Sequence, residues 1–124
     1  MEIKFRNSIA LVKNIETSRK FYRDVIGLQA IEDFETFVLF QDNFAIHTAD
    51  LFYEYINKTY HGEKLGRDNV EFYITTSDLS AMEQKLRESN VEFIHGIRQF
   101  DWGEKAIRIL DPDGHILEIG DAHK

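Results

Sequence analysis

The chain repeats one order of structural signals twice, and this internal duplication limits the folds open to it. Moving the first half along by 64 residues places Asn14 on Asp78 and Ile15 on Leu79, so two predicted helix starts coincide. Moving a later segment by 71 residues places 41–47 on 112–118. The second half is therefore longer by seven residues (71 minus 64), and these lie around 95–104, where we expect a long hairpin.

Each half is predicted to form a strand, a helix and three further strands, because apolar residues first alternate at period two and then recur three and four apart. The first half gives strands near 4–12, 28–33, 35–41 and 44–49 and a helix over about 15–26. The second gives strands near 70–76, 91–98, 104–111 and 115–120 and a helix over about 79–89. Asp42-Asn43 and Asp113-Gly114 are predicted hairpin turns.

This pattern predicts a single α+β domain over 1–124, built from two tandem βαβββ modules. Module 1 covers about 1–49 and module 2 about 68–124. Between them, the linker 50–67 holds an aromatic-rich stretch that we expect to be helical up to Gly62.

Composition excludes several classes of partner. The formal net charge is −7, and no basic patch exists to bind a nucleic-acid backbone. No apolar stretch has the length of a membrane span, and the chain has no cysteine for a disulfide or a thiolate ligand. We therefore expect a cytoplasmic protein without nucleic-acid or membrane partners. The acidic excess would suit a cationic ligand if the acidic side chains line a cavity, but we favour the interpretation that it keeps a small protein soluble.

Alternation along the strands predicts which side chains face away from the helices. Within a βαβββ module the helix covers one face of the sheet and leaves the other face open. The open side then carries Asn7, His47, Glu71 and Glu118, one from each of four strands. Each of them alone could be a solvated or structural residue. Because all four fall on duplicated positions, we expect them to converge on one site.

Two stretches resemble a known group of proteins. Residues 14–28, with the sequence NIETSRKFYRDVIGL, are similar to the first helix of the glyoxalase, bleomycin-resistance and extradiol-dioxygenase families. Trp102-Gly103 followed by residues 111–119, DPDGHILEI, resembles the same families near their C-terminus. The chain thus looks like a member of the vicinal oxygen chelate superfamily. The resemblance covers nearly the whole chain and specifies no single activity.

The resemblance implies a U-shaped mixed-sheet cleft, a homodimer and one divalent metal ion that chelates vicinal oxygens of a substrate. Its ligand positions correspond to Asn7, His47, Glu71 and Glu118, with Glu71 and Glu118 also available as catalytic bases. A glyoxalase has His and Glu in each half, so a standard glyoxalase I is not expected. The oxygen-rich set suits Mn²⁺, Ni²⁺, Fe²⁺ or Mg²⁺, and Zn²⁺ is a further candidate.

Four further residues are expected to bind substrate: Tyr73 and Arg108 from the strands, and Phe100 and Trp102 from the long hairpin. Arg108 could pair with Glu118 or clamp a substrate carboxylate. The aromatic stretch 51–56 could be a lid, and we favour a subunit contact.

Two functions remain open from the sequence. The first, which we favour, is a metal-dependent lyase, isomerase or dioxygenase acting on a small oxygenated substrate. The second is a metal-free protein that sequesters an aromatic or cationic compound, as antibiotic-resistance proteins of this fold do. His47, Glu71 and Glu118 favour the first function, whereas Asn7, the acidic charge and the aromatic residues favour the second.

Overall fold

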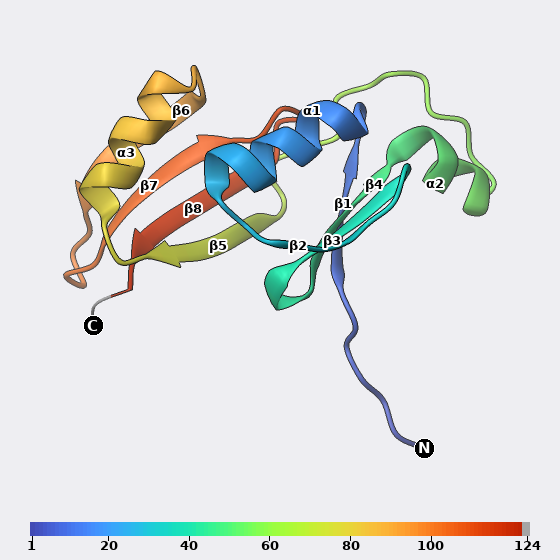
Figure 1. Ribbon diagram of the computed structural model, residues 1–124, viewed down its shortest axis with the longest axis horizontal. Coiled ribbons are helices and arrows are strands. Elements are labelled where there is room, and N and C mark those ends of the chain that lie inside the picture. The colour runs from blue at the N-terminus through green and yellow to red at the C-terminus, as the bar shows by residue number, and fades with distance from the viewer. Residues whose placement is uncertain (123–124) are drawn as a thin grey trace. The chain divides into compact units, whose positions relative to one another are not determined.

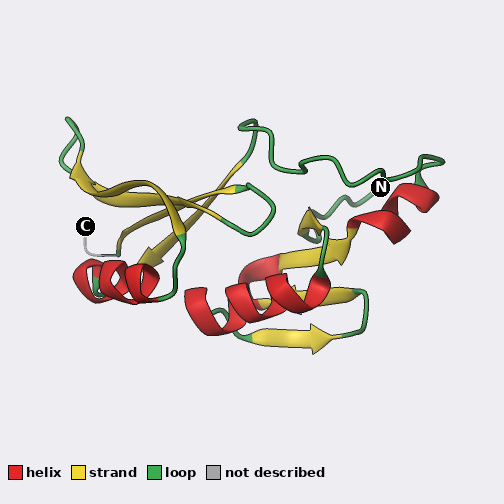
Figure 2. Ribbon diagram, turned by 90° about the horizontal axis from the view of Figure 1, so that it is seen from above, coloured by secondary structure: helices red, strands yellow, loops and turns green. Residues whose placement is uncertain are grey.

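The computed structural model describes residues 1–122, so the last two residues of module 2 lie outside the described part. The chain divides into two compact units, Met1–Leu65 and Gly66–Lys124. Within the described residues, each unit holds one four-stranded mixed sheet with a helix on one of its faces (Figures 1 and 2). The predicted α+β fold of two βαβββ modules is therefore confirmed.

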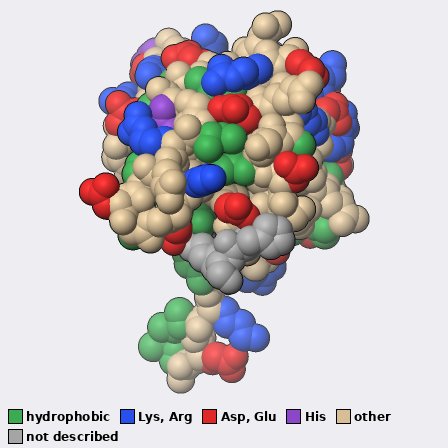
Figure 3. Space-filling model, turned by 90° about the vertical axis from the view of Figure 1, so that its left-hand side faces the viewer, with side chains coloured by type: hydrophobic (Ala, Val, Ile, Leu, Met, Phe, Trp, Pro, Cys, Tyr) green, Lys and Arg blue, Asp and Glu red, His purple; other side chains and the backbone are tan. Residues whose placement is uncertain are grey.

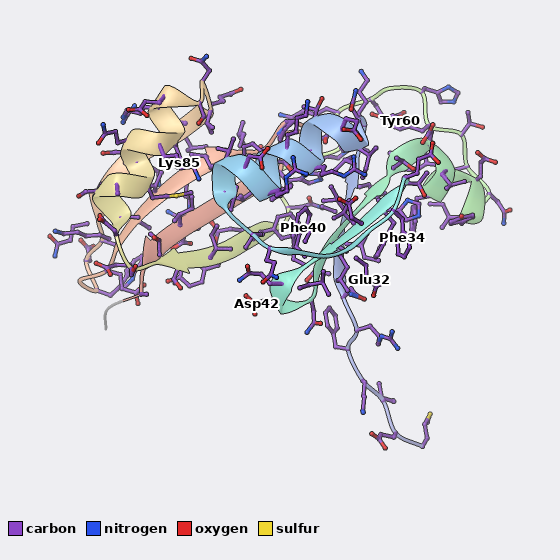
Figure 4. All side chains as sticks on the ribbon, viewed as in Figure 1. Glu32, Phe34, Phe40, Asp42, Tyr60 and Lys85 are labelled. Atoms are coloured by element: carbon purple, nitrogen blue, oxygen red, sulfur yellow. The ribbon has the colours of Figure 1, made fainter. Side chains whose placement is uncertain are left out.

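The first unit contains the following elements: β1 Ser8–Val12, α1 Ile15–Lys20, a π-helical turn Phe21–Ile26, β2 Ala30–Asp33, β3 Phe37–Phe40, a short turn Gln41–Asn43, β4 Phe44–Thr48 and α2 Ala49–Tyr55. The strand order is β1-β4-β3-β2. β1 runs parallel to β4, and the other neighbours are antiparallel. The β3–β4 turn carries Asp42, which is labelled in Figure 4. Asp42 and Asn43 both have positive φ, as the predicted tight hairpin requires.

The second unit repeats this order with β5 Glu71–Thr76, α3 Leu79–Glu88, β6 Glu92–Gln99, β7 Lys105–Leu110 and β8 Ile116–Asp121. Its strand order, β5-β8-β7-β6, is the counterpart of that in the first unit. None of the helices formed by residues 1–122 is long and apolar enough to cross a membrane.

Both main helices begin at the predicted caps. The Asn14 side chain accepts a hydrogen bond from the Thr17 amide at 3.1 Å, and the Asp78 side chain accepts one from the Ala81 amide at 3.0 Å. Each satisfies an amide that a helix start leaves without a partner. The π-helical turn that continues α1 ends at Gly27, whose φ of 95° is left-handed.

The predicted faces of β7 and β8 are also confirmed. Leu117 and Ile119 of β8 and Ile107 and Ile109 of β7 are fully buried on the side covered by α3. Glu118, one residue out of phase, lies on the opposite face with Arg108. The alternation of the pleated strand therefore decides which side chains are free for function.

Two element boundaries differ from prediction. β1 was expected from residue 4 but begins at Ser8, because its partner β4 begins at Phe44, directly opposite. The linker helix was expected to continue to Gly62 but ends at Tyr55, and Asn57 takes a left-handed φ of 61° that breaks the helix.

His115 fixes the β7–β8 turn through a buried ion pair. Its Nδ1 lies 2.8 Å from Oδ2 of Asp111, a carboxylate that also accepts the amides of Asp113 and His115 at 2.9 and 2.8 Å. Burial lowers the pKa of His115, but the hydrogen bond and charge of Asp111 outweigh it, so the pKa is raised overall.

We expect His115→Gln to reduce the free energy of unfolding by about 1 to 2 kcal/mol at pH 6. A raised pKa in the folded state means that protonated His115 stabilises the fold below its unfolded pKa, and that this stability is lost as the pH rises through the folded value. The wild type and the variant should therefore converge above neutral pH. Urea unfolding from pH 5 to 8 measures the difference, and a gap that widens with pH would contradict the assignment.

Candidate functional site

The residues expected at the site are divided between the units. Asn7 and His47 belong to the first unit, whereas Glu71, Tyr73, Phe100, Trp102, Arg108 and Glu118 belong to the second. Each group is therefore described within its own unit.

In the second unit, strand register brings the charged residues to one face of the sheet. Glu118 lies opposite Tyr73 of β5 on one side and opposite Arg108 of β7 on the other. Glu71 lies two residues before Tyr73, on the same face. The open face thus carries two carboxylates with a guanidinium beside them.

Arg108 joins the two carboxylates directly. Its Nε donates to Oε1 of Glu71 at 2.8 Å, and its Nη2 donates to Oε1 of Glu118 at 2.9 Å. The side chains of Glu118 and Arg108 are 13% and 25% exposed, against 38% for Glu71. The predicted pairing of Arg108 with Glu118 is therefore present, and Glu71 shares the same cation.

His95 of β6 completes this cluster and was not predicted from the sequence. Its Nδ1 lies 2.8 Å from the Gly96 carbonyl oxygen and must donate to it, so its Nε2 is free to accept from Nη1 of Arg108 at 3.3 Å. The open-side alternation could have located His95, but an irregularity in β6 between Phe93 and His95 shifts the phase.

The two carboxylates have opposite pKa shifts. Burial raises the pKa of Glu71, but the hydrogen bond from Arg108, the interaction with the neighbouring Glu118 carboxyl and the charge of Arg108 lower it overall. For Glu118, burial and then the neighbouring Glu71 carboxyl raise the pKa more than Arg108 lowers it. The single guanidinium therefore compensates the negative charge of Glu118 less fully than that of Glu71.

An aromatic stack adjoins the charged cluster. The rings of Phe100 and Trp102 are stacked, with centroids 4.9 Å apart and planes 12° apart. The guanidinium carbon of Arg108 lies 5.1 Å from the centroid of the Phe100 ring. Trp102 lies in the β6–β7 turn and is 66% exposed, which leaves indole surface available for contact.

Tyr73 was expected to bind substrate, and its ring packs against the neighbouring strand β8. Its ring leans over Gly120 of β8, where an added Cβ atom would lie 2.8 Å from the Tyr73 hydroxyl. Gly120 therefore makes room for this ring, and Tyr73 covers the part of the open face beyond Glu118.

In the first unit, His47 lies among aromatic rings. The centroids of Phe37, Phe52 and Tyr55 lie 5.8 to 5.9 Å from that of His47, each in an edge-to-face arrangement. The Nδ1 atom of His47 is 2.9 Å from the Thr48 carbonyl oxygen. Part of the aromatic stretch 51–56 therefore packs against His47 within the unit.

The structure does not bring Asn7 and His47 together. β1 and β4 are parallel, and His47 pairs with Leu11, four residues beyond Asn7. This separation is about 13 Å along the strands, which is too far for two side chains to hold one ion. The expectation that the two residues converge within the first module is wrong.

The strand register also corrects which residues of the two halves are structurally equivalent. The helix caps differ by 64 residues (78 minus 14), which makes Ile9 the counterpart of Tyr73. Ile9 pairs with Ala45, whereas Tyr73 pairs with Glu118. Ala45, a fully buried residue, therefore occupies the position that Glu118 has in the second unit, and His47 lies two residues beyond it.

These donors do not fit the metal ion that the resemblance implies. No group of three or more His, Asp or Glu side chains able to hold a metal ion is found among residues 1–122. The two carboxylates that do approach each other are already bonded to Arg108, a fixed cation. A divalent ion would have to displace this guanidinium, which also occupies the Nε2 atom of His95.

Comparison with known proteins gives one family and several similar structures. The family model for a glyoxalase-like domain matches residues 5–124. A protein of unknown function from Agrobacterium tumefaciens is 39% identical, with a TM-score of 0.92 over 98% of this chain and 96% of that one. A glyoxalase/bleomycin resistance protein/dioxygenase from Nocardioides is 20% identical, with a TM-score of 0.74 over 98% and 84%. A lactoylglutathione lyase from A. tumefaciens is 16% identical, with a TM-score of 0.71 over 98% and 96%. The last two likenesses concern the fold.

Proposed function

Since the chain belongs to the glyoxalase-like domain family of the vicinal oxygen chelate superfamily, we propose that it binds a small organic cation without a metal ion. The binding surface is the open face of the second unit. The observation that carries this proposal is the Arg108 guanidinium, which is bonded to both Glu71 and Glu118. Of the two functions open from the sequence, the geometry supports the metal-free one.

The charge of the cluster favours a cation over an anion. Glu71 and Glu118 carry two negative charges and Arg108 one positive charge, which leaves one negative charge in excess. All three nitrogens of Arg108 already have partners, so the guanidinium is not free to clamp a substrate carboxylate. Arg108 is shared between Glu71 and Glu118. A ligand cation near Glu118 would add the positive charge that this carboxylate lacks.

The aromatic stack favours a flat ligand. Trp102 is 66% exposed in a turn beside the charged residues, and Phe100 supports it from one side. An exposed indole gains free energy when a planar cation covers it, both from apolar burial and from cation–π attraction. A planar aromatic cation therefore matches both parts of the surface.

Calorimetric titration with 9-aminoacridine, a flat cation at pH 7.5, tests the proposal. Acridine has the same ring system and is neutral at this pH, so it measures the contribution of the rings alone. We expect the cation to bind at least about tenfold more tightly than acridine, the effect of one partly desolvated charge interaction. Equal affinity for both probes, or no binding of either probe, would contradict the proposed binding of a planar cation.

Variants separate the two parts of the surface. We expect Glu118→Gln to weaken 9-aminoacridine about tenfold and to leave acridine nearly unchanged. Trp102→Ala should weaken both probes by a similar factor. Glu88→Gln, an exposed carboxylate on α3, serves as the control and should change neither affinity. A loss that is the same for Glu118→Gln and Glu88→Gln would show only a general charge effect.

Metal ions should not stabilise the protein. An ion that binds the folded state raises the melting temperature, and the rise grows with the logarithm of the ion concentration divided by its Kd. We expect protein treated with a chelator to melt at the same temperature after Mn²⁺, Ni²⁺, Fe²⁺ or Zn²⁺ is added. If the purified protein instead holds one ion per chain, and Glu118→Gln or His47→Ala removes it, the metal-dependent enzyme is the correct function.

A further inference from the structure

The seven residues before β1 form an exposed arm, here called the N-terminal arm (residues 1–7). Figure 1 shows it as a single extended trace that leaves β1 and ends at the N-terminus. Its apolar side chains are almost fully in water, with Ile3 81% and Phe5 83% exposed. The same arm is visible in Figure 3 as a projection that carries hydrophobic, acidic and basic side chains. Two large apolar residues exposed side by side mark a contact surface.

The arm lacks a neighbouring strand for a topological reason. The pairing of β1 with β4 begins at Ser8, opposite Phe44. Immediately before Phe44, the turn at Gln41–Asn43 reverses the chain, so β4 has no backbone level with the arm. β1 is also the edge strand of its sheet. An extended segment with unpaired amides and carbonyls is a template for another strand.

The arm alternates in chemistry. Met1, Ile3 and Phe5 share the side that continues to Ile9, a residue 45% exposed on β1. Glu2, Lys4 and Arg6 take the other side, where Glu2 and Lys4 form an ion pair at 3.5 Å. In an extended segment this alternation gives one apolar and one charged face, the pattern of a strand that packs on one side.

We propose that this arm pairs antiparallel with the same arm of a second copy of the chain, with Ile3 opposite Ile3. In this register Met1 lies opposite Phe5, and Glu2 lies opposite Lys4, each twice because the contact is twofold symmetric. A shift by two residues in one direction would place Glu2 opposite Glu2. A shift in the other would place Glu2 opposite Arg6 but Lys4 opposite Lys4, whereas the Ile3 register has no like-charged pair. Opposite charges directly across a strand pair stabilise it and like charges destabilise it. Charge therefore selects the Ile3 register.

Charge reversal tests this register without touching the folded units. Glu2→Lys places two lysines against two lysines in the paired arms, and Lys4→Glu places glutamates against glutamates. We expect each variant to dissociate about tenfold more readily than the wild type in sedimentation velocity at low salt. An equal mixture of the two variants restores both opposite pairs, so it should associate like the wild type. The double variant Glu2→Lys/Lys4→Glu should do the same.

The mixture makes the test specific to arm pairing, because neither variant alone presents complementary charges. Glu88→Lys on α3 is the control for charge alone and should leave association unchanged. A wild type that stays monomeric overturns the proposal. A dimer that both single variants keep equally well also overturns it and assigns the contact elsewhere, for example to residues 51–56. Single variants that dissociate but do not recombine would show that the arm contacts another part of the second copy.

Discussion

Replacing Gly66 by alanine is expected to destabilise the second unit by about 3 kcal/mol, the upper end of the usual cost of overpacking. A Cβ atom at this position would lie 2.1 Å from the carbonyl carbon and oxygen of Gly114 and 2.5 Å from the His115 amide nitrogen. All three are backbone atoms of the β7–β8 turn, so no side chain can rotate away. The Gly66 amide also donates to the Asp113 carbonyl at 3.0 Å, a hydrogen bond that the clash would lengthen.

Urea unfolding followed by tryptophan fluorescence measures this loss, because the chain has a single tryptophan, Trp102, in the second unit. Gly62→Ala is the matched control. Gly62 has a positive φ of 83° but open space around it, so alanine there costs only about 1 kcal/mol of backbone strain. Equal effects at the two glycines would mean that the contact between Gly66 and the turn is not tight in solution.

Replacing Arg108 by methionine is expected to cost about 2 kcal/mol at pH 7, because two carboxylates then face each other without their shared cation. Breaking a fully buried ion pair costs about 3 to 5 kcal/mol. The cost is smaller here because the Glu71 side chain is 38% exposed and water screens its charge. Methionine keeps much of the apolar stem of the arginine, so most of the loss is electrostatic.

The pH dependence identifies the cause of this loss. In the wild type, Arg108 holds the pKa of Glu71 below its ordinary value, so its contribution to stability is present above the unfolded pKa and is lost as the pH falls through the folded one. In the variant, both carboxylates have pKa values raised by each other, so protonation restores stability as the pH falls. The difference between the two proteins should therefore shrink from pH 7 towards about pH 4. The double variant Arg108→Met/Glu118→Gln should recover part of the loss at pH 7, and no recovery would mean that packing is responsible.

The fold could be predicted because its signals are local. Asn14 and Asp78 are cap residues before amphipathic helices, and the alternation around Glu118 separates a covered face from an open one. The same signals occur in both halves, and this repetition supports the predicted fold more strongly than either half does alone. Arg108 was placed beside Glu118 by the same alternation.

The candidate site was harder to predict because it depends on the register between strands that are distant in sequence. The sequence alignment placed His47 on Glu118, but the backbone pairing places Ala45 there. Both residues lie on the same face, so alternation alone cannot distinguish a shift of two residues. His95 was missed because irregularities in β6 shift its phase relative to β7.

In the function proposed above, the guanidinium between Glu71 and Glu118 takes the place of a metal ion, so ligand binding would not depend on a supply of ions. A metal centre fills and empties with the concentration of free metal around it, and a chelator or a competing ion can disable it. Arg108 is covalently part of the chain and keeps its charge at every physiological pH. A protein with the proposed function would be ready to take up its ligand as soon as it has folded, even where transition metals are scarce.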